Sequence, residues 1–241
     1  MHQPLLIKNI LMHARRTFPA TEIVSRTDEK STKTHSIEEI GRRAAQLSHT
    51  LIALKIKNGD RVATLAWNDH RHLELYYAVS GIGAVCHTIN PRLPQKQLSY
   101  IIEHANDALI FVDEGLVGLL ETVLRSITNR PKIIVLADAG APLPISSSGA
   151  ELLNYEEMIA NYAVDFEYPA FDENTASGLC YTSGTTGNPK GVLYSHRSTT
   201  LHAMQVALSF SNALYEGARV LPIVPLFHVN AWGLPFTCPL I

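Results

Sequence analysis

The sequence has few cysteines and no long apolar run. Its three cysteines, Cys86, Cys180 and Cys238, are far apart and odd in number, so no disulfide framework is expected. They lie in apolar surroundings, which predicts buried thiols in a reducing cytoplasm. No stretch of about 18 or more apolar residues occurs, so the sequence predicts no membrane span. The amino-terminal residues also lack the apolar centre of a secretory signal.

Charge of one sign is equally scarce. Charged residues make up 17% of the chain and the formal net charge is −2, so there is no general attraction to nucleic acid or to an anionic membrane. Apolar residues make up 46% of the 241 positions. That content is sufficient for the core of one large domain, or of one domain and part of another.

What the sequence does contain is a regular alternation of helical and strand-like segments. A capping box begins one helix, because the side chains of Ser36 and Glu39 can each accept from the other residue's amide. Strands alternating with helices of ten or more residues predict an α/β fold with a doubly wound, largely parallel sheet flanked by helices. The predicted strands are 61–67, 84–89, 108–113, 132–138, 176–182, 191–195 and 219–224, and the predicted helices include 72–83, 94–105, 115–128, 151–161 and 196–210.

The middle and the end of the chain indicate its organisation. Residues 139–150 are rich in Pro, Ser and Gly. They predict an exposed connection between an amino-terminal α/β subdomain, 1–138, and the start of a second subdomain, 151–241. The last ten residues, 232–241, are almost entirely apolar and include no capping residue or polar tail. We therefore expect either a fragment of a longer protein or a partner that covers this end.

The most unusual stretch is YTSGTTGNPKG, residues 181–191, which lies between two apolar segments and has no aliphatic side chain. Its glycines allow backbone N–H groups to point into one concavity, and its hydroxyls add further donors. Lys190 adds a positive charge, and Pro189 stiffens the approach to it. This composition predicts a polyphosphate cradle in a strand–loop–strand hairpin, with a flexible turn-rich hairpin as the alternative. The spacing matches neither a P-loop nor a G-x-G-x-x-G turn.

The same stretch closely resembles the phosphate loop of the adenylate-forming superfamily, which includes acyl-CoA synthetases, luciferases and peptide-synthetase adenylation domains. VPLFHVNAWGLPF, 224–236, resembles the downstream aromatic motif of medium- and long-chain fatty-acyl-CoA ligases. Three upstream stretches, 56–69, 81–93 and 98–114, are similar to the amino-terminal subdomain of that family. The resemblance covers the chain from about residue 25 to residue 241, and implies an incomplete amino-terminal portion of the adenylate-forming fold.

In that family a carboxylate attacks the α-phosphate of Mg·ATP, which gives an acyl-adenylate and pyrophosphate, and the thiol of coenzyme A then displaces AMP. The resemblance thus implies ATP and Mg²⁺, coenzyme A as co-substrate, and a fatty acid. It implies that Thr182 ligates Mg²⁺ and that Lys190 and His228 are catalytic. The residues that it assigns to the β- and γ-phosphates are Thr182, Ser183, Gly184, Thr185, Thr186, Gly187 and Lys190.

The aromatic motif supplies the implied acyl pocket. His228 is expected beside the acyl carboxylate and the adenylate, and Trp232 at the wall or gate of the acyl tunnel. Phe227, Val229 and Leu234 are their expected apolar neighbours. Plain core packing is the alternative for both His228 and Trp232.

Other polar residues are expected to lie on the surface. This group consists of Asp69, His70, His72, Glu74, Glu156 and Glu157. The pair Ser195-His196 resembles part of a hydrolase site, but no G-x-S-x-G elbow surrounds any serine, so we reject that interpretation.

Members of the family run to roughly twice this length, and their adenine-binding, ribose-binding and lid-lysine motifs have no counterpart in this sequence. We expect the amino-terminal part of an ATP-dependent fatty-acid–CoA ligase that is inactive or nearly so on its own. The alternative is a nucleotide-binding or interaction fragment that docks on a longer ligase. The sequence also leaves open whether the chain forms a homodimer.

Overall fold

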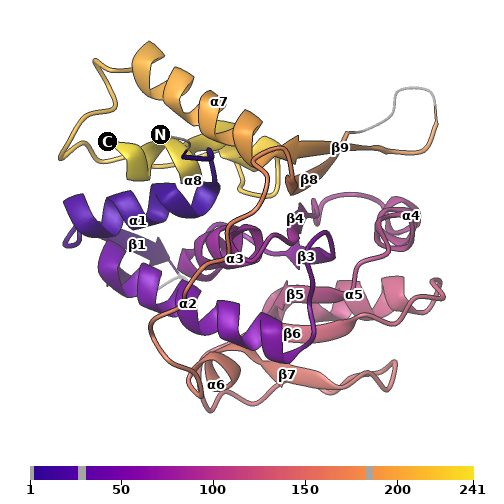
Figure 1. Ribbon diagram of the computed structural model, residues 1–241. Helices are drawn as coiled ribbons and strands as arrows, with labels where there is room; N and C mark the ends of the chain where they lie inside the picture. Colours follow the sequence, from indigo (N-terminus) through magenta and orange to yellow (C-terminus); the bar gives the residue numbers. More distant parts are fainter. Residues whose placement is uncertain (1–2, 27–30, 183–186) are drawn as a thin grey trace.

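The computed structural model describes residues 3–26, 31–182 and 187–241. A seven-stranded sheet forms its centre, in the order β7-β6-β5-β3-β4-β8-β9, and β1 and β2 form a separate antiparallel pair (Figure 1). Every neighbouring pair in the large sheet is parallel except β8–β9. The strands are β1 (Glu22–Arg26), β2 (Thr32–Ser36), β3 (Arg61–Leu65), β4 (Val85–Thr88), β5 (Leu109–Asp113), β6 (Lys132–Leu136), β7 (Leu152–Asn154), β8 (Ala176–Thr182) and β9 (Lys190–Ser195).

Helices cover both faces of this sheet. Because side chains alternate along a strand, Val62 and Phe111 pack in the core with the first three helices and α6, whereas Ala63 and Ile110 pack against α4 and α5. The helices are α1 (Ile7–Thr17), α2 (Ile37–Ala53), α3 (His70–Gly81), α4 (Gln95–Ala105), α5 (Val117–Leu124), α6 (Tyr155–Ile159), α7 (His196–Ser209) and α8 (Leu234–Thr237), with 3₁₀ turns at Glu114–Leu116, Val229–Gly233 and Cys238–Leu240.

The predicted doubly wound sheet is confirmed, and its strand order locates a switch point. From β3 the chain crosses to β4 on one side, and then returns past β3 to β5, β6 and β7 on the other. In open α/β sheets, ligands bind beyond the carboxyl ends of the strands where the order reverses. Here that position is the end of β3 beside the end of β5.

Three segments differ from the sequence-based expectation. The predicted strand at 219–224 is wrong: the carbonyls of Pro222 and Val224 bond the side chain of Asn68 rather than a neighbouring strand. The predicted helix at 151–161 begins four residues late, because Leu152 and Leu153 pair with β6 first. The β1–β2 pair was not predicted at all.

The large sheet continues past the predicted connection at 139–150, since β8 pairs with β4 in parallel. The division into subdomains stays a prediction. Within the described part of the chain, no helix is both long enough and apolar enough to cross a membrane.

Candidate functional site

The β8–β9 hairpin carries the predicted phosphate loop where the two strands are joined, between Thr182 and Lys190. Thr182 and Lys190 are paired in register, and both are exposed. This confirms the strand–loop–strand setting of the stretch. Ser183, Gly184, Thr185 and Thr186, which were predicted to contact phosphate, lie outside the described residues.

The described groups at this loop end of the hairpin are suited to binding a phosphate. Among the residues that the structure describes, no carboxylate forms an ion pair with Lys190. Among the described residues, Thr182 Oγ1 donates to the Lys190 carbonyl alone, through a long hydrogen bond of 3.4 Å. Gly187 is exposed, and no described side chain crowds its Cα. An ammonium group with no ion-pair partner among the described residues and a weakly bonded hydroxyl are the kinds of group that bind a phosphate and its Mg²⁺.

Hydrogen bonds fix both strands of the hairpin to neighbouring helices. The Tyr181 hydroxyl lies 2.7 Å from Nδ1 of His104 on α4. Ser195 is the N-cap of α7, where its side chain accepts from the Ser198 amide. Nδ1 of His196 accepts from the Ile7 amide at 3.2 Å, and burial lowers the pKa of this histidine to about 4. The Ser195-His196 pair therefore serves helix capping and packing, which agrees with rejecting the hydrolase.

The aromatic-motif segment is attached to the β3–α3 region by hydrogen bonds. Asn68 donates to the carbonyls of Pro222 and Val224 at 3.1 and 3.3 Å, and it accepts from the Leu226 amide at 2.7 Å. The buried Tyr76 hydroxyl on α3 donates to the Leu226 carbonyl at 2.7 Å. Sequence analysis did not single out Asn68 or Tyr76, because neither lies in the phosphate loop or in the aromatic motif.

The motif itself forms a left-handed turn. Val229, Asn230, Ala231 and Trp232 all have φ between 47° and 55°, and Gly233 follows at 80°. Each non-glycine residue in this region costs roughly 1–2 kcal/mol, so the turn is strained. Such strain persists only where surrounding contacts impose it, and it is commonly found at functional sites.

The two predicted motifs meet at Asn230. Its Oδ1 accepts from the Cys180 thiol of β8 at 3.5 Å and lies 3.0 Å from the Tyr76 hydroxyl. Cys180 is only two residues before Thr182. The structure therefore brings the strained turn alongside the strand that carries the phosphate loop.

The predicted acyl-pocket residues divide into two groups. Phe227 is buried, with its ring edge-on to Trp67 at 5.6 Å and the guanidinium of Arg92 5.8 Å from its centroid. His228 is exposed, and Trp232 is 64% exposed, so neither packs in the core. Val229 is also exposed and Leu234 is half-buried.

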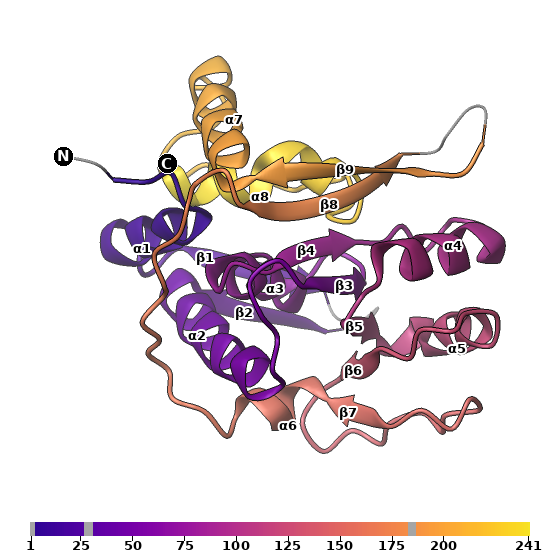
Figure 2. The same cartoon turned by 45° about the vertical axis from the view of Figure 1, so that its right-hand side comes forward.

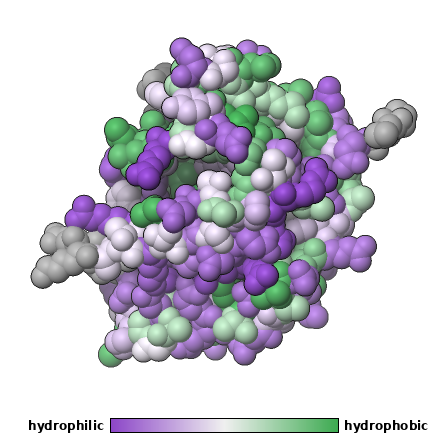
Figure 3. All heavy atoms as spheres, turned by 90° about the vertical axis from the view of Figure 1, so that its left-hand side faces the viewer, coloured by the Kyte–Doolittle hydropathy of each residue, from purple (hydrophilic) through white to green (hydrophobic). Residues whose placement is uncertain are grey.

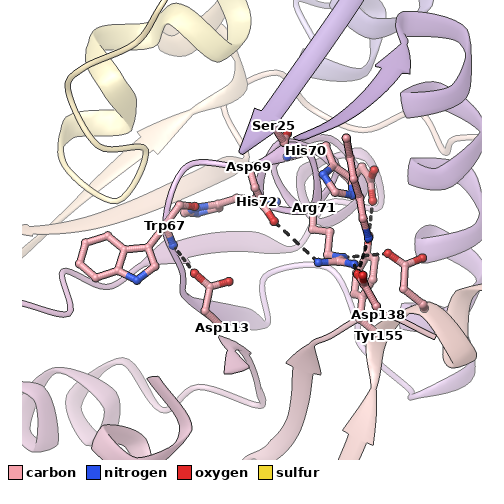
Figure 4. A network of polar contacts seen from close by, with 12 residues as sticks. Ser25, Trp67, Asp69, His70, Arg71, His72, Asp113, Asp138 and Tyr155 are labelled. Carbon is pink, nitrogen blue, oxygen red and sulfur yellow. Dashed lines mark hydrogen bonds and ion pairs between the residues drawn. The ribbon is translucent and has the colours of Figure 1, made fainter. Parts of the chain in front are cut away.

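A carboxyl group that sequence analysis missed lies at the switch point. Asp113, at the end of β5, accepts from the Trp67 amide at 2.6 Å (Figure 4). Burial, reinforced by the nearby charge of Asp69, raises the pKa of Asp113 to about 7. An aspartate that ends a buried parallel strand was the available signal.

The expectation that Asp69, His70, His72, Glu74 and Glu156 lie on the surface is wrong. His70, His72 and Glu74 are buried, and Asp69 and Glu156 are largely so. Only Glu157 is exposed as expected.

These residues belong to an ionic network that joins α2, α3 and α6. Arg43 bonds Glu74 at 2.7 Å and Glu156 at 2.9 Å, and Arg71 bonds Glu156 at 2.7 Å. Arg71 also bonds Asp138 (Figure 4). Burial raises the pKa of Glu74 to about 7, although Arg43 opposes this. The alternation of polar and apolar residues in α3 did not indicate burial, because all twelve residues of the helix are buried.

The comparison with known families agrees with this geometry. The model of the AMP-binding enzyme family matches residues 11–241. The chain belongs to the AMP-binding enzyme family. Three curated relatives are CoA ligases: a 3-methylmercaptopropionyl-CoA ligase of Ruegeria lacuscaerulensis (47% identical), a medium-chain-fatty-acid–CoA ligase of Ectopseudomonas oleovorans (42%) and a long-chain-fatty-acid–CoA ligase of Thermus thermophilus (41%).

These alignments cover 99–100% of this chain but only 42–44% of the relatives. The chain thus spans less than half the length of the curated relatives that it matches. Among solved structures, a long-chain-fatty-acid–CoA ligase of Archaeoglobus fulgidus superposes with a TM-score of 0.80 at 19% identity, over 100% of this chain and 46% of that one. That likeness confirms the fold of an amino-terminal portion of such ligases.

Proposed function

We propose that this chain is the amino-terminal part of an AMP-forming fatty-acid–CoA ligase, and that its β8–β9 hairpin binds the triphosphate of ATP. The observation that carries the proposal is the exposed register pair Thr182–Lys190, in which a hydroxyl lies beside a cation that has no ion-pair partner among the described residues. The names of the relatives support a fatty acid and coenzyme A as the other substrates. We also propose a cytoplasmic location, because all three cysteines are free thiols, as is usual in a reducing compartment.

The hairpin residues have distinct roles in this proposal. Lys190 neutralises charge on the β- and γ-phosphates, and donors from Ser183 to Gly187 complete the cradle. When bound, Mg²⁺ supplies further neutralisation of the departing pyrophosphate, and Thr182 is the hydroxyl that would ligate it. Preorganised donors of this kind stabilise developing charge in a phosphoryl transfer without reorganising.

The strained turn supplies the acyl side of the site. Because the φ values of Val229 to Trp232 are left-handed, the turn leaves His228 and Trp232 exposed while Asn230 contacts β8. We propose that His228 orients the acyl carboxylate and that Trp232 contacts the acyl chain. Phe227, Val229 and Leu234 form the apolar surroundings.

Catalysis requires more than these residues. The relatives are more than twice as long as this chain, and we propose that their remaining length supplies the groups that bind adenine and ribose and close over the site. One preorganised group is typically worth about 3–4 kcal/mol of transition-state stabilisation. Without several of them, the 241-residue chain is expected to form no acyl-adenylate.

Pyrophosphate release tests this proposal. The purified chain, shown to be folded by circular dichroism, is incubated with Mg·ATP, with and without a medium- or long-chain fatty acid. We expect no release that depends on the fatty acid. Release that rises with fatty acid would show that this chain adenylates unaided, and would overturn the assignment of missing catalytic groups to the longer protein.

The alternative, an interaction fragment that docks on a longer ligase, is favoured by one surface. Figure 3 shows apolar patches on the upper part of the face where the end of α7 and the segment after it lie in Figure 1. Apolar surface of this kind commonly marks an interface. Size-exclusion chromatography with light scattering distinguishes a monomer from a homodimer or a larger assembly. The exposed apolar side chains of this region include Leu201, Met204, Leu208, Phe210, Leu221 and Ile223.

A further inference from the structure

A cavity of about 660 Å³ lies far from the hairpin, where α5 ends and β6 and β7 begin. Figure 2 shows β7 and the β8–β9 hairpin at opposite ends of the stack of strands. Six strand spacings separate β7 from β9, which corresponds to roughly 29 Å. The cavity is therefore separate from the proposed nucleotide site.

The lining of this cavity is strongly basic. Arg125, Arg130 and Lys132 contribute three positive charges, and Glu151 is the one acidic residue among the lining residues. In the described part of the chain, none of the three cations forms an ion pair. This contrasts with Arg43 and Arg71, whose charges are neutralised by Glu74, Glu156 and Asp138.

Hydrogen bonds to the main chain fix one of these cations. Nη1 of Arg130 donates to the carbonyls of Leu124 and Asn129 at 2.9 and 3.3 Å, and also to that of Ile127. No described residue accepts from its Nη2 or Nε. Since a guanidinium carries five donors in a rigid fork, Arg130 retains free donors in a defined position.

The part of the wall that contains Ser147 and Ser148 is also fixed in place. The buried carboxylate of Glu121 on α5 accepts from the hydroxyls of Ser146 and Ser147 and from the Ser148 amide, at 2.6–3.1 Å. Although burial opposes it, these bonds hold the pKa of Glu121 below its ordinary value. Ser147 also accepts from Nη2 of Arg125 at 3.0 Å. The carboxylate of Glu121 is thus hydrogen-bonded to residues 146–148 of the wall itself.

We propose that this cavity binds a phosphate group. Arginine forks and a lysine around one hollow match the oxygens of a phosphate, and among the described residues no carboxylate pairs with them. The phosphate belongs either to a free phosphorylated molecule or to the head group of an anionic lipid. Ile145, two residues before Ser147, is 97% exposed and would contact the lipid in the second case.

Two binding assays on the 241-residue chain separate these sources. Calorimetric titration with inorganic pyrophosphate reports a free phosphate, and co-sedimentation with phosphatidylglycerol vesicles, against phosphatidylcholine, reports a head group. Each assay compares wild type with Lys132→Gln and Arg125→Gln. Lys57→Gln removes the same charge at an exposed position outside the cavity, and Lys190→Gln removes the hairpin cation.

We expect Lys132→Gln and Arg125→Gln each to weaken binding about tenfold in one of the two assays, as for loss of one charge-assisted bond, while Lys57→Gln has no effect. For vesicles, Ile145→Ser should weaken binding as well. Lys132 donates to no described side chain, so its substitution leaves the fold intact. Two results would overturn the proposal. In the first, both cavity variants bind both ligands as tightly as wild type does. In the second, pyrophosphate binding is lost only in Lys190→Gln and the chain does not bind vesicles. The first result does not bear on whether the hairpin binds ATP, and the second would support phosphate binding by the hairpin.

Discussion

The Leu226 amide donates to Oδ1 of Asn68 at 2.7 Å, across 158 positions of sequence. With the two bonds from Asn68 to the carbonyls of Pro222 and Val224, it attaches the aromatic-motif segment to the turn after β3. The position of His228 and Trp232 therefore depends on a side chain that lies outside either motif.

Asn68→Ala tests this attachment. The variant loses three hydrogen bonds at once, so we expect a loss of about 2–3 kcal/mol in unfolding free energy and faster amide exchange at Leu226. Hydrogen exchange followed by mass spectrometry and urea unfolding measure these two effects. Asn161→Ala is the matched control, because Asn161 is exposed and donates one bond to the Glu157 carbonyl. Exchange at Leu226 that equals the control would contradict the attachment.

Relief of strain in the left-handed turn is a second test. Asparagine adopts positive φ more readily than a β-branched residue, so Val229→Asn is expected to stabilise the fold by about 1 kcal/mol. Val164→Asn makes the same change at a valine that is 40% exposed, against 43% for Val229, and that is not among the positive-φ residues. Thermal unfolding compares the two. Equal effects would show that the turn stores no strain at Val229.

Asp113 predicts a pH dependence of stability. Its folded pKa of about 7 lies above the ordinary value of 3.8, so the unfolded chain ionises first as the pH rises. The contribution of Asp113 to stability should therefore fall between about pH 4 and pH 7 and then level off.

Asp113→Asn removes this dependence and keeps an acceptor for the Trp67 amide. Relative to wild type, the variant should gain about 2 kcal/mol between pH 4.5 and pH 7.5, which is below the full linkage value because the carboxyl is partly solvated. Urea unfolding at the two pH values measures the gain. The exposed Asp165→Asn serves as control. A gap between variant and wild type that stays constant with pH would exclude a raised pKa.

Much of the fold could be predicted from periodicity and turn signals. The capping box at Ser36 and Glu39 forms as predicted. The strand–loop–strand setting of Thr182 and Lys190 also follows from local sequence, since apolar runs flank a segment rich in glycine and hydroxyls. These features depend on neighbours in the chain, which is why sequence alone was sufficient.

The errors in the sequence-based predictions arise where contacts between residues far apart in the sequence determine the structure. Residues 219–224 have the pattern of a strand, but Asn68 takes the carbonyls that a neighbouring strand would need. Glu74 and Arg43 are charged residues with the pattern of a surface, yet they neutralise each other inside the fold at 2.7 Å. Asn230 could not be recognised either, because its role depends on the left-handed turn that brings it to Cys180.

The most direct test of the central claim is the affinity of the 241-residue chain for Mg·ATP, compared with Lys190→Gln and with the control Lys57→Gln. Calorimetric titration, on variants shown to be folded, gives the three dissociation constants. If the hairpin binds the phosphates, wild type and Lys57→Gln should bind alike, and Lys190→Gln should bind about tenfold more weakly. Equal affinity for all three proteins, or no binding by any of them, would contradict the assignment of the hairpin as the phosphate site.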